Sequence, residues 1–243
     1  MKVVPFLNSV IRIRIRLHYT WLVAIILITV AVVTQFSTAS PLWLRIILGI
    51  AASFLFFVAI CIREFILNFI ATSKGIRVKS VTMFIFGGVS QIADETATPA
   101  LDLLLAVVGM LFNLIVAGIF YIIYFVLKYT ENIMVDVLMQ WLAFICFMLA
   151  LFHFIPGFPL DSGRILRSLL WKATGKYQRA TRIASWTGWV IGLIFIIGGI
   201  LIVIYTQQWF VGALLAFPGL VLQNAATHGR RQVAGVIPVV SDG

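Results

Sequence analysis

The residues in this sequence that could do chemistry are a few charged side chains inside strongly apolar segments. Arg63 and Glu64 are adjacent within the run IREFILNFIATSKGI at 62–76, and Asp161 follows the proline-rich break FIPGFP at 154–159. An ionisable side chain near the centre of a bilayer is costly unless it is paired or hydrated, so such residues indicate a functional site. The same residues are also compatible with an ion pair between neighbouring helices that fixes their packing.

The composition predicts that these residues are surrounded by lipid. Hydrophobic residues make up 62% of the 243 positions, charged residues make up 11%, and the mean hydropathy is +1.10. Apolar runs long enough to cross a hydrocarbon layer of roughly 30 Å recur along the chain. We therefore expect an all-α polytopic membrane protein with about six transmembrane helices, although five or seven also fit the runs. The expected spans are 17–36, 42–71, 101–127, 135–154, 184–205 and 209–227.

The lysines and arginines are distributed unevenly between the two sides of these spans. With the N-terminus inside, most of the 18 basic residues fall in inside segments, whereas Arg45 and Lys128 fall outside. The positive-inside rule therefore predicts a multi-pass integral membrane protein with both termini in the cytoplasm. The basic cytoplasmic face also favours anionic lipid as a partner. Basic and aromatic residues are not interleaved as in a nucleic-acid groove, so we expect no nucleic-acid partner.

The segment GIRVKSVTMFIFGGVSQI at 75–92 differs from the spans on either side of it. It is rich in β-branched and aromatic residues, and Gly87 and Gly88 interrupt it. This pattern predicts a short β hairpin at the cytoplasmic face between the second and third spans. One interpretation is an exposed edge that pairs with an extended substrate by strand addition. The other is a loop that lies along the membrane and has no binding role.

Three blocks of the sequence resemble motifs of the site-2 protease family of intramembrane zinc metalloproteases. The segment 63–76 is similar to the family stretch H-E-x-x-H-x-x-x-A-x-x-x-G-I and keeps its glutamate as Glu64. The segment 77–92 resembles V-K-S-I-T-L-F-x-F-G-G-V. The segment HFIPGFPLDSGR at 153–164 resembles N-L-x-P-x-F-P-L-D-G-G-R and keeps its aspartate as Asp161. The blocks follow one another in the order typical of the family.

The resemblance implies a domain organisation and a set of site residues. It implies a site-2-protease-like membrane domain over 1–228 and a short polar cytoplasmic tail over 229–243. Glu64 stands at the family position of the general base, and Asp161 stands at the position of a zinc ligand. The residues implied in substrate binding along the strand are Phe86, Gly87, Gly88 and Val89.

Both zinc-binding histidines of the family are replaced in this sequence. Residues i and i+4 share a helix face, so histidines at that spacing can reach one ion. Arg63 and Leu67 hold these positions, and neither a guanidinium nor an alkyl group ligates zinc. One alternative is that His153, which stands where the family has asparagine, joins Glu64 and Asp161 as a replacement ligand. Another is that the Arg63 guanidinium takes the place of the ion and bridges to Glu64 or Asp161.

We therefore expect an inactive relative of the metalloendopeptidases that binds transmembrane or extended peptide segments of membrane proteins and needs no cofactor. The first alternative is an active intramembrane metalloendopeptidase with unusual metal ligands, which would require zinc. The second alternative is a transporter or lipid-handling protein. The lack of internal sequence repeats weighs against a transporter.

Overall fold

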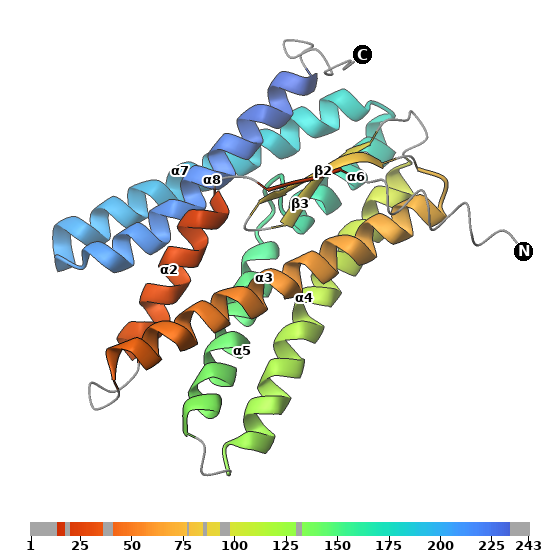
Figure 1. Ribbon diagram of the computed structural model, residues 1–243. Coiled ribbons are helices and arrows are strands. Elements are labelled where there is room, and N and C mark those ends of the chain that lie inside the picture. Colours follow the sequence, from red (N-terminus) through yellow and green to blue (C-terminus); the bar gives the residue numbers. More distant parts are fainter. Residues whose placement is uncertain are drawn as a thin grey trace, which may run out of the picture. The chain divides into compact units, whose positions relative to one another are not determined.

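The computed structural model describes residues 14–17, 20–35, 41–76, 78–84, 87–92, 98–129 and 133–233. These residues form three strands and seven helices (Figure 1). In chain order the elements are β1 (Arg14–Leu17), α2 (Thr20–Gln35), α3 (Leu42–Ser73), β2 (Val78–Phe84), β3 (Gly87–Ile92), α4 (Pro99–Leu127), α5 (Ile133–His153), α6 (Asp161–Thr174), α7 (Tyr177–Thr206) and α8 (Trp209–Val233).

The chain divides into two compact units. The first unit comprises Met1–Ala97 and Val108–Phe152, and the second comprises Thr98–Val107 and His153–Gly243. The first unit therefore holds the sheet, α2, α3, most of α4 and nearly all of α5. The second holds the first turns of α4 together with α6, α7 and α8.

The strands of the first unit form one sheet in the order β1-β2-β3. β1 runs parallel to β2, with Arg14 opposite Ser80. β2 runs antiparallel to β3, with Thr82 opposite Val89. Both β2 and β3 contact α3, and β3 lies at an edge of the sheet. The sequence RIRIRL at 12–17 explains β1, because polar and apolar residues that alternate with a period of two indicate a strand.

The helix that follows the first strand packs closely on α3. A Cβ atom at Gly49 would lie 2.9 Å from Cγ2 of Thr29, so glycine is needed where α2 and α3 meet. Near this point the Ser53 hydroxyl donates to the backbone oxygen of Gly49 at 2.9 Å. α3 has 32 residues, and at 1.5 Å per residue a helix of that length extends about 48 Å. It is therefore long enough to cross a bilayer and continue beyond it.

The predicted fold class was wrong in its preferred count of six spans and in its all-α assignment. Five of the described helices, rather than six, are long and apolar enough to cross a membrane, because the apolar part of α2 covers only Trp21–Thr34. The expected first span began at residue 17, but residues 14–17 form β1. An all-α protein with a short β hairpin is therefore incorrect, since β2 and β3 belong to a three-stranded mixed sheet that includes β1.

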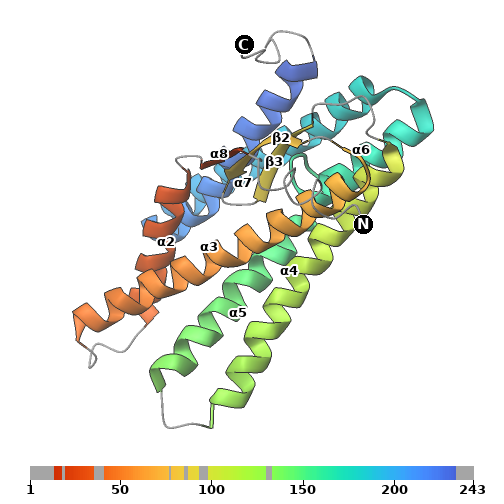
Figure 2. The same cartoon turned by 45° about the vertical axis from the view of Figure 1, so that its right-hand side comes forward.

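In the second unit, α7 and α8 lie side by side along most of their length (Figure 1, Figure 2). Glycines allow this close approach. A Cβ atom at Gly192 would lie 2.7 Å from the Gly219 oxygen, and one at Gly199 would lie 2.6 Å from the Gly212 oxygen. Small residues at a helix interface let two backbones pack closely, which is a common means of association in membranes.

The proline-rich break before α6 is held against α7 by backbone contacts. The Phe158 amide donates to the Ala184 oxygen at 3.1 Å, and a Cβ atom at Gly188 would lie 2.2 Å from the Phe158 oxygen. α6 ends at Thr174, and the left-handed conformation of the next residue, Gly175 (φ 67°), turns the chain towards α7. Glycine adopts this conformation readily because it lacks the Cβ atom that makes the left-handed region unfavourable for other residues.

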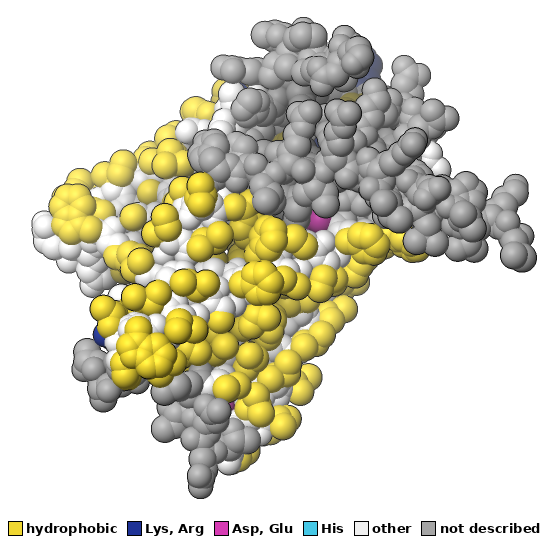
Figure 3. Space-filling view, in the orientation of Figure 1, with side chains coloured by type: hydrophobic (Ala, Val, Ile, Leu, Met, Phe, Trp, Pro, Cys, Tyr) yellow, Lys and Arg dark blue, Asp and Glu magenta, His cyan; other side chains and the backbone are white. Residues whose placement is uncertain are grey.

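Large apolar side chains are exposed along the outer faces of the helices. Figure 3 shows hydrophobic side chains over much of the described surface on the face in view. Exposed examples on different helices include Phe54 at 62%, Ile122 at 62% and Ile194 at 61%. So much exposed apolar surface fits contact with lipid and does not fit a soluble monomer.

Candidate functional site

In the first unit, α3 carries the residues predicted at the general-base and former histidine positions. Arg63, Glu64, Leu67 and Asn68 are all buried, with exposed fractions from 3% to 6%. Leu67 lies one turn beyond Arg63, as the i and i+4 spacing requires. This part of α3 therefore buries two ionisable groups inside a helix that is otherwise almost wholly apolar.

The two charged residues of α3 form an ion pair. Nη1 of Arg63 donates a hydrogen bond to Oε1 of Glu64. One turn later, the Asn68 side-chain amide donates to the backbone oxygen of Glu64 at 2.7 Å. The predicted bridge from the Arg63 guanidinium to Glu64 is thus present. It places a permanent positive charge beside the carboxylate that stands at the general-base position.

In the second unit, His153 and Asp161 lie on either side of the proline-rich break. His153 is the last residue of α5, Asp161 is the first residue of α6, and their exposed fractions are 1% and 2%. Nε2 of His153 is 3.8 Å from Oδ2 of Asp161. That distance is too long for a hydrogen bond, and the two form an ion pair only when the imidazole is protonated. The break therefore brings these predicted site residues together.

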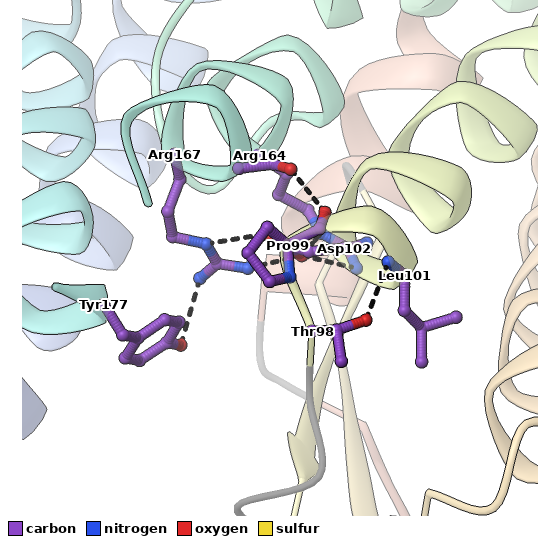
Figure 4. Close-up of polar contacts among 8 residues, drawn as sticks. Thr98, Pro99, Leu101, Asp102, Arg164, Arg167 and Tyr177 are labelled. Carbon is purple, nitrogen blue, oxygen red and sulfur yellow. Dashed lines mark hydrogen bonds and ion pairs between the residues drawn. The ribbon is translucent and has the colours of Figure 1, made fainter. Parts of the chain in front are cut away.

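The sequence reasoning missed a cluster of buried charges that links α4 to α6. Asp102, in the first turn of α4, accepts hydrogen bonds from Nε of Arg167 at 2.9 Å and from Nη2 of Arg167 at 2.7 Å. Nε and Nη2 of Arg164 both lie 3.3 Å from Oδ1 of Asp102. Figure 4 shows both guanidinium groups directed at this carboxylate, with Tyr177 beyond Arg167. The available signal was an acidic residue at the second position of the expected span 101–127.

Arg167 is the better anchored of the two arginines. Burial lowers the pKa of Arg167, but the Asp102 carboxylate and Tyr177 raise it, and the net shift is upward. Its Nη1 lies 3.4 Å from the Tyr177 hydroxyl, and its guanidinium lies 5.0 Å from the centre of the Phe158 ring. Arg167 therefore ties the start of α4 to α6, to the start of α7 and to the proline-rich break.

The strand residues predicted to bind substrate are only partly described. Phe86 lies outside the described residues. Gly87 and Gly88 begin β3, and Val89 follows them opposite Thr82 of β2. Since β3 is an edge strand of the sheet, these residues lie where a further strand could pair.

Comparison with known proteins shows which proteins this chain is similar to. The family model described as Peptidase family M50 matches residues 128–197, which include the proline-rich break and Asp161. A protein of Synechocystis named as a zinc metalloprotease is 29% identical over 81% of this chain and 50% of its own length. A zinc metalloprotease of Methanocaldococcus jannaschii is 28% identical over 80% of this chain and 53% of its own length. The resemblance to the site-2 protease family is confirmed.

A solved structure extends the similarity to the fold. The site-2 protease from M. jannaschii matches 96% of this chain and 95% of its own, with a TM-score of 0.69 and 23% sequence identity. Together with the five apolar helices, the family resemblance identifies a site-2-protease-like integral membrane protein that crosses the bilayer several times. The chain spans about half the length of the zinc metalloproteases it matches in sequence.

The residues of this site-2-protease-like chain do not fit the zinc ion of its relatives. Arg63 and Leu67, at the two histidine positions, offer no donor atom to a metal. In the described part of the chain, no group of three or more His, Cys, Asp or Glu side chains is arranged to hold a metal ion. This finding gives no support to a replacement site built from His153, Glu64 and Asp161.

Proposed function

We propose that this chain is a non-catalytic, zinc-independent member of the site-2-protease-like proteins that binds transmembrane or extended peptide segments. The observation that carries the proposal is the buried pair of Arg63 and Glu64. A zinc protease needs a cation that polarises the scissile carbonyl and lowers the pKa of a bound water. A guanidinium donates hydrogen bonds, but it neither binds a hydroxide as a metal does nor gives up its proton.

The pair also accounts for how a pocket built around a metal can stay folded without one. Burial of a carboxylate in this position is costly unless a positive charge lies beside it. The guanidinium of Arg63 supplies the positive charge and a hydrogen bond to the carboxylate in one side chain. Loss of the two histidines is therefore compatible with retention of Glu64, which here serves packing rather than catalysis.

Support for peptide binding comes from the edge strand. β3 pairs with β2 along one side, and the order of the sheet leaves its other side at the edge. An extended peptide that adds to such an edge gains main-chain hydrogen bonds, and these do not depend on catalytic residues. A chain that has lost its metal ligands can therefore keep this mode of binding.

Site-specific photocrosslinking in native membranes tests the binding half of the proposal. A photoreactive residue at Val89 in the edge strand should capture membrane-protein segments, whereas one at Thr82 in the central strand should capture few. Equal capture at both positions, or capture at neither, would contradict binding along β3.

A cleavage assay tests the non-catalytic half. The purified chain should leave a panel of model transmembrane substrates intact, with or without added zinc. Cleavage that disappears in Glu64→Gln and on chelation would instead establish the alternative favoured by the names of the relatives, an active metalloendopeptidase.

A further inference from the structure

The turn between α6 and α7 carries four exposed cations, which we call the basic elbow. Its members are Lys172, Lys176, Arg179 and Arg182. Lys172 lies in the last turn of α6, and Gly175 then reverses the chain through its left-handed conformation into α7. The two arginines follow in the first turns of α7. A sharp turn thus gathers four positive charges within eleven residues of sequence.

The described part of the second unit provides no acidic partner for the basic elbow. Its acidic residues there are Asp102 and Asp161, and both are buried, at 8% and 2% exposure. Asp102 is already bonded to two arginines, and Asp161 lies beside His153. Within the described part of the second unit, the four cations of the elbow therefore form a positive surface without an acidic partner.

Along the face of α7 that begins at the basic elbow, the chemical type of the exposed side chains changes in a regular order. Arg179 and Arg182 are followed at helical spacing by Trp186, which is 49% exposed. Residues three, four and seven apart lie on the same helix face, so these three side chains form one stripe. Farther along the stripe are Val190 at 45% and Ile194 at 61% exposure. The order along the helix is cationic, then aromatic, then aliphatic.

Two further residues strengthen the aromatic level of this stripe. The Trp189 ring lies 5.5 Å from the Trp186 ring in an edge-to-face contact. The guanidinium of Arg230, from α8, lies 4.5 Å from the centre of the Trp186 ring and 5.7 Å from that of Trp189. Tryptophan is typical of the boundary between headgroups and acyl chains, so this cluster marks that level on α7.

We propose that the basic elbow and the α7 stripe form a binding site for an acidic phospholipid. The phosphate of the headgroup lies at Arg179 and Arg182, the glycerol region lies at Trp186, and an acyl chain follows Val190 and Ile194. The distance between levels fits, since four residues of helix advance about 6 Å. A soluble anion would use only the cations, whereas the exposed aliphatic continuation matches a lipid.

Tryptophan quenching by brominated lipids tests this site. The chain is reconstituted in vesicles of phosphatidylcholine that contain increasing amounts of brominated phosphatidylglycerol, or of brominated phosphatidylcholine as reference. The difference in tryptophan fluorescence between the wild type and the double variant Trp186→Phe with Trp189→Phe reports on the proposed site. We expect brominated phosphatidylglycerol to quench this fluorescence at a mole fraction at least about tenfold lower than brominated phosphatidylcholine requires. The reason is that each cation near an acidic lipid strengthens association about fivefold.

Two double variants separate a local site from general charge attraction. Arg179→Gln with Arg182→Gln should abolish most of the preference, while Arg179→Lys with Arg182→Lys should keep it. Lys74→Gln with Lys128→Gln removes the same net charge from two positions outside the elbow, of which Lys74 is exposed and Lys128 half-buried, and should leave the preference unchanged. An equal loss in that control, or a preference that survives the glutamine pair, would overturn the proposal.

Inorganic phosphate distinguishes a lipid from a free anion. Phosphate added at constant ionic strength, with chloride as reference, should not relieve quenching by the acidic lipid any more than chloride does. If phosphate displaces the lipid selectively, the site binds a soluble anion and the lipid assignment is wrong. Because Arg179 and Arg182 are exposed, their replacement should leave the melting temperature nearly unchanged, which confirms that each variant is folded.

Discussion

Replacement of Arg63 by methionine should destabilise this chain strongly. The change keeps most of the side-chain volume but removes the charge beside Glu64, which is only 4% exposed. Removal of one partner of a buried pair typically costs about 3–5 kcal/mol, because the remaining charge is left without compensation. At roughly 2–4 °C per kcal/mol for a chain of this size, the melting temperature should fall by about 6–20 °C.

A double variant shows whether the loss comes from the broken ion pair. Arg63→Met with Glu64→Gln removes both charges together, and replacement of a whole buried pair is often neutral or stabilising. The double variant should therefore recover most of the stability lost in Arg63→Met. Lys74→Met is the matched control, since Lys74 is an exposed cation just beyond the end of the same helix, where a surface change is worth at most about 0.5 kcal/mol.

The assay is thermal melting followed by intrinsic fluorescence, in one detergent and at one scan rate for all four proteins. The expected order of melting temperature is wild type close to Lys74→Met, the double variant slightly different from both, and Arg63→Met clearly lowest. If Arg63→Met has the same melting temperature as Lys74→Met, the guanidinium does not stabilise the site. If the double variant is as unstable as the single, the loss is one of packing rather than of charge.

Three further predictions use contrasts built into the chain. Arg167→Met should lower the melting temperature more than Arg164→Met, because Arg167 holds Asp102 at 2.7–2.9 Å and Arg164 only at 3.3 Å; equal losses would argue against this ranking. Gly199→Ala should weaken the α7–α8 contact, whereas Gly198→Ala should not, since the added Cβ would lie 2.6 Å from backbone in the first and 3.4 Å from a side chain in the second. Tags on both termini should be accessible only from the cytoplasmic side, and protection of either would contradict the predicted orientation.

Much of the site could be predicted because charged side chains in an apolar sequence must be paired or hydrated, and few residues are available to pair with them. Arg63 and Glu64 stand out in a 32-residue helix that is otherwise almost free of charge. Their pairing follows from the cost of leaving either of them alone in lipid. The approach of His153 to Asp161 likewise follows from the proline-rich break, which leaves only a short connection between α5 and α6.

Other features escaped prediction because they depend on long-range contacts. The pairing of β1 with β2 joins residues far apart in the sequence, and the apolar residues after Arg16 favoured an early start to the first span. Asp102 resembles any acidic residue in the first turn of a helix, where the helix dipole favours it. Only its two arginines, more than sixty positions later, reveal it as the centre of a buried cluster.

The zinc content of the purified chain is the most direct test of the central claim that this site-2-protease-like protein is metal-independent. We predict far less than one zinc ion per chain by elemental mass spectrometry after purification without chelator. The variant with Arg63→His and Leu67→His, prepared in parallel, is the control in which two ligands are restored at the i and i+4 positions and zinc uptake is expected. One tightly held zinc ion per wild-type chain would contradict the account.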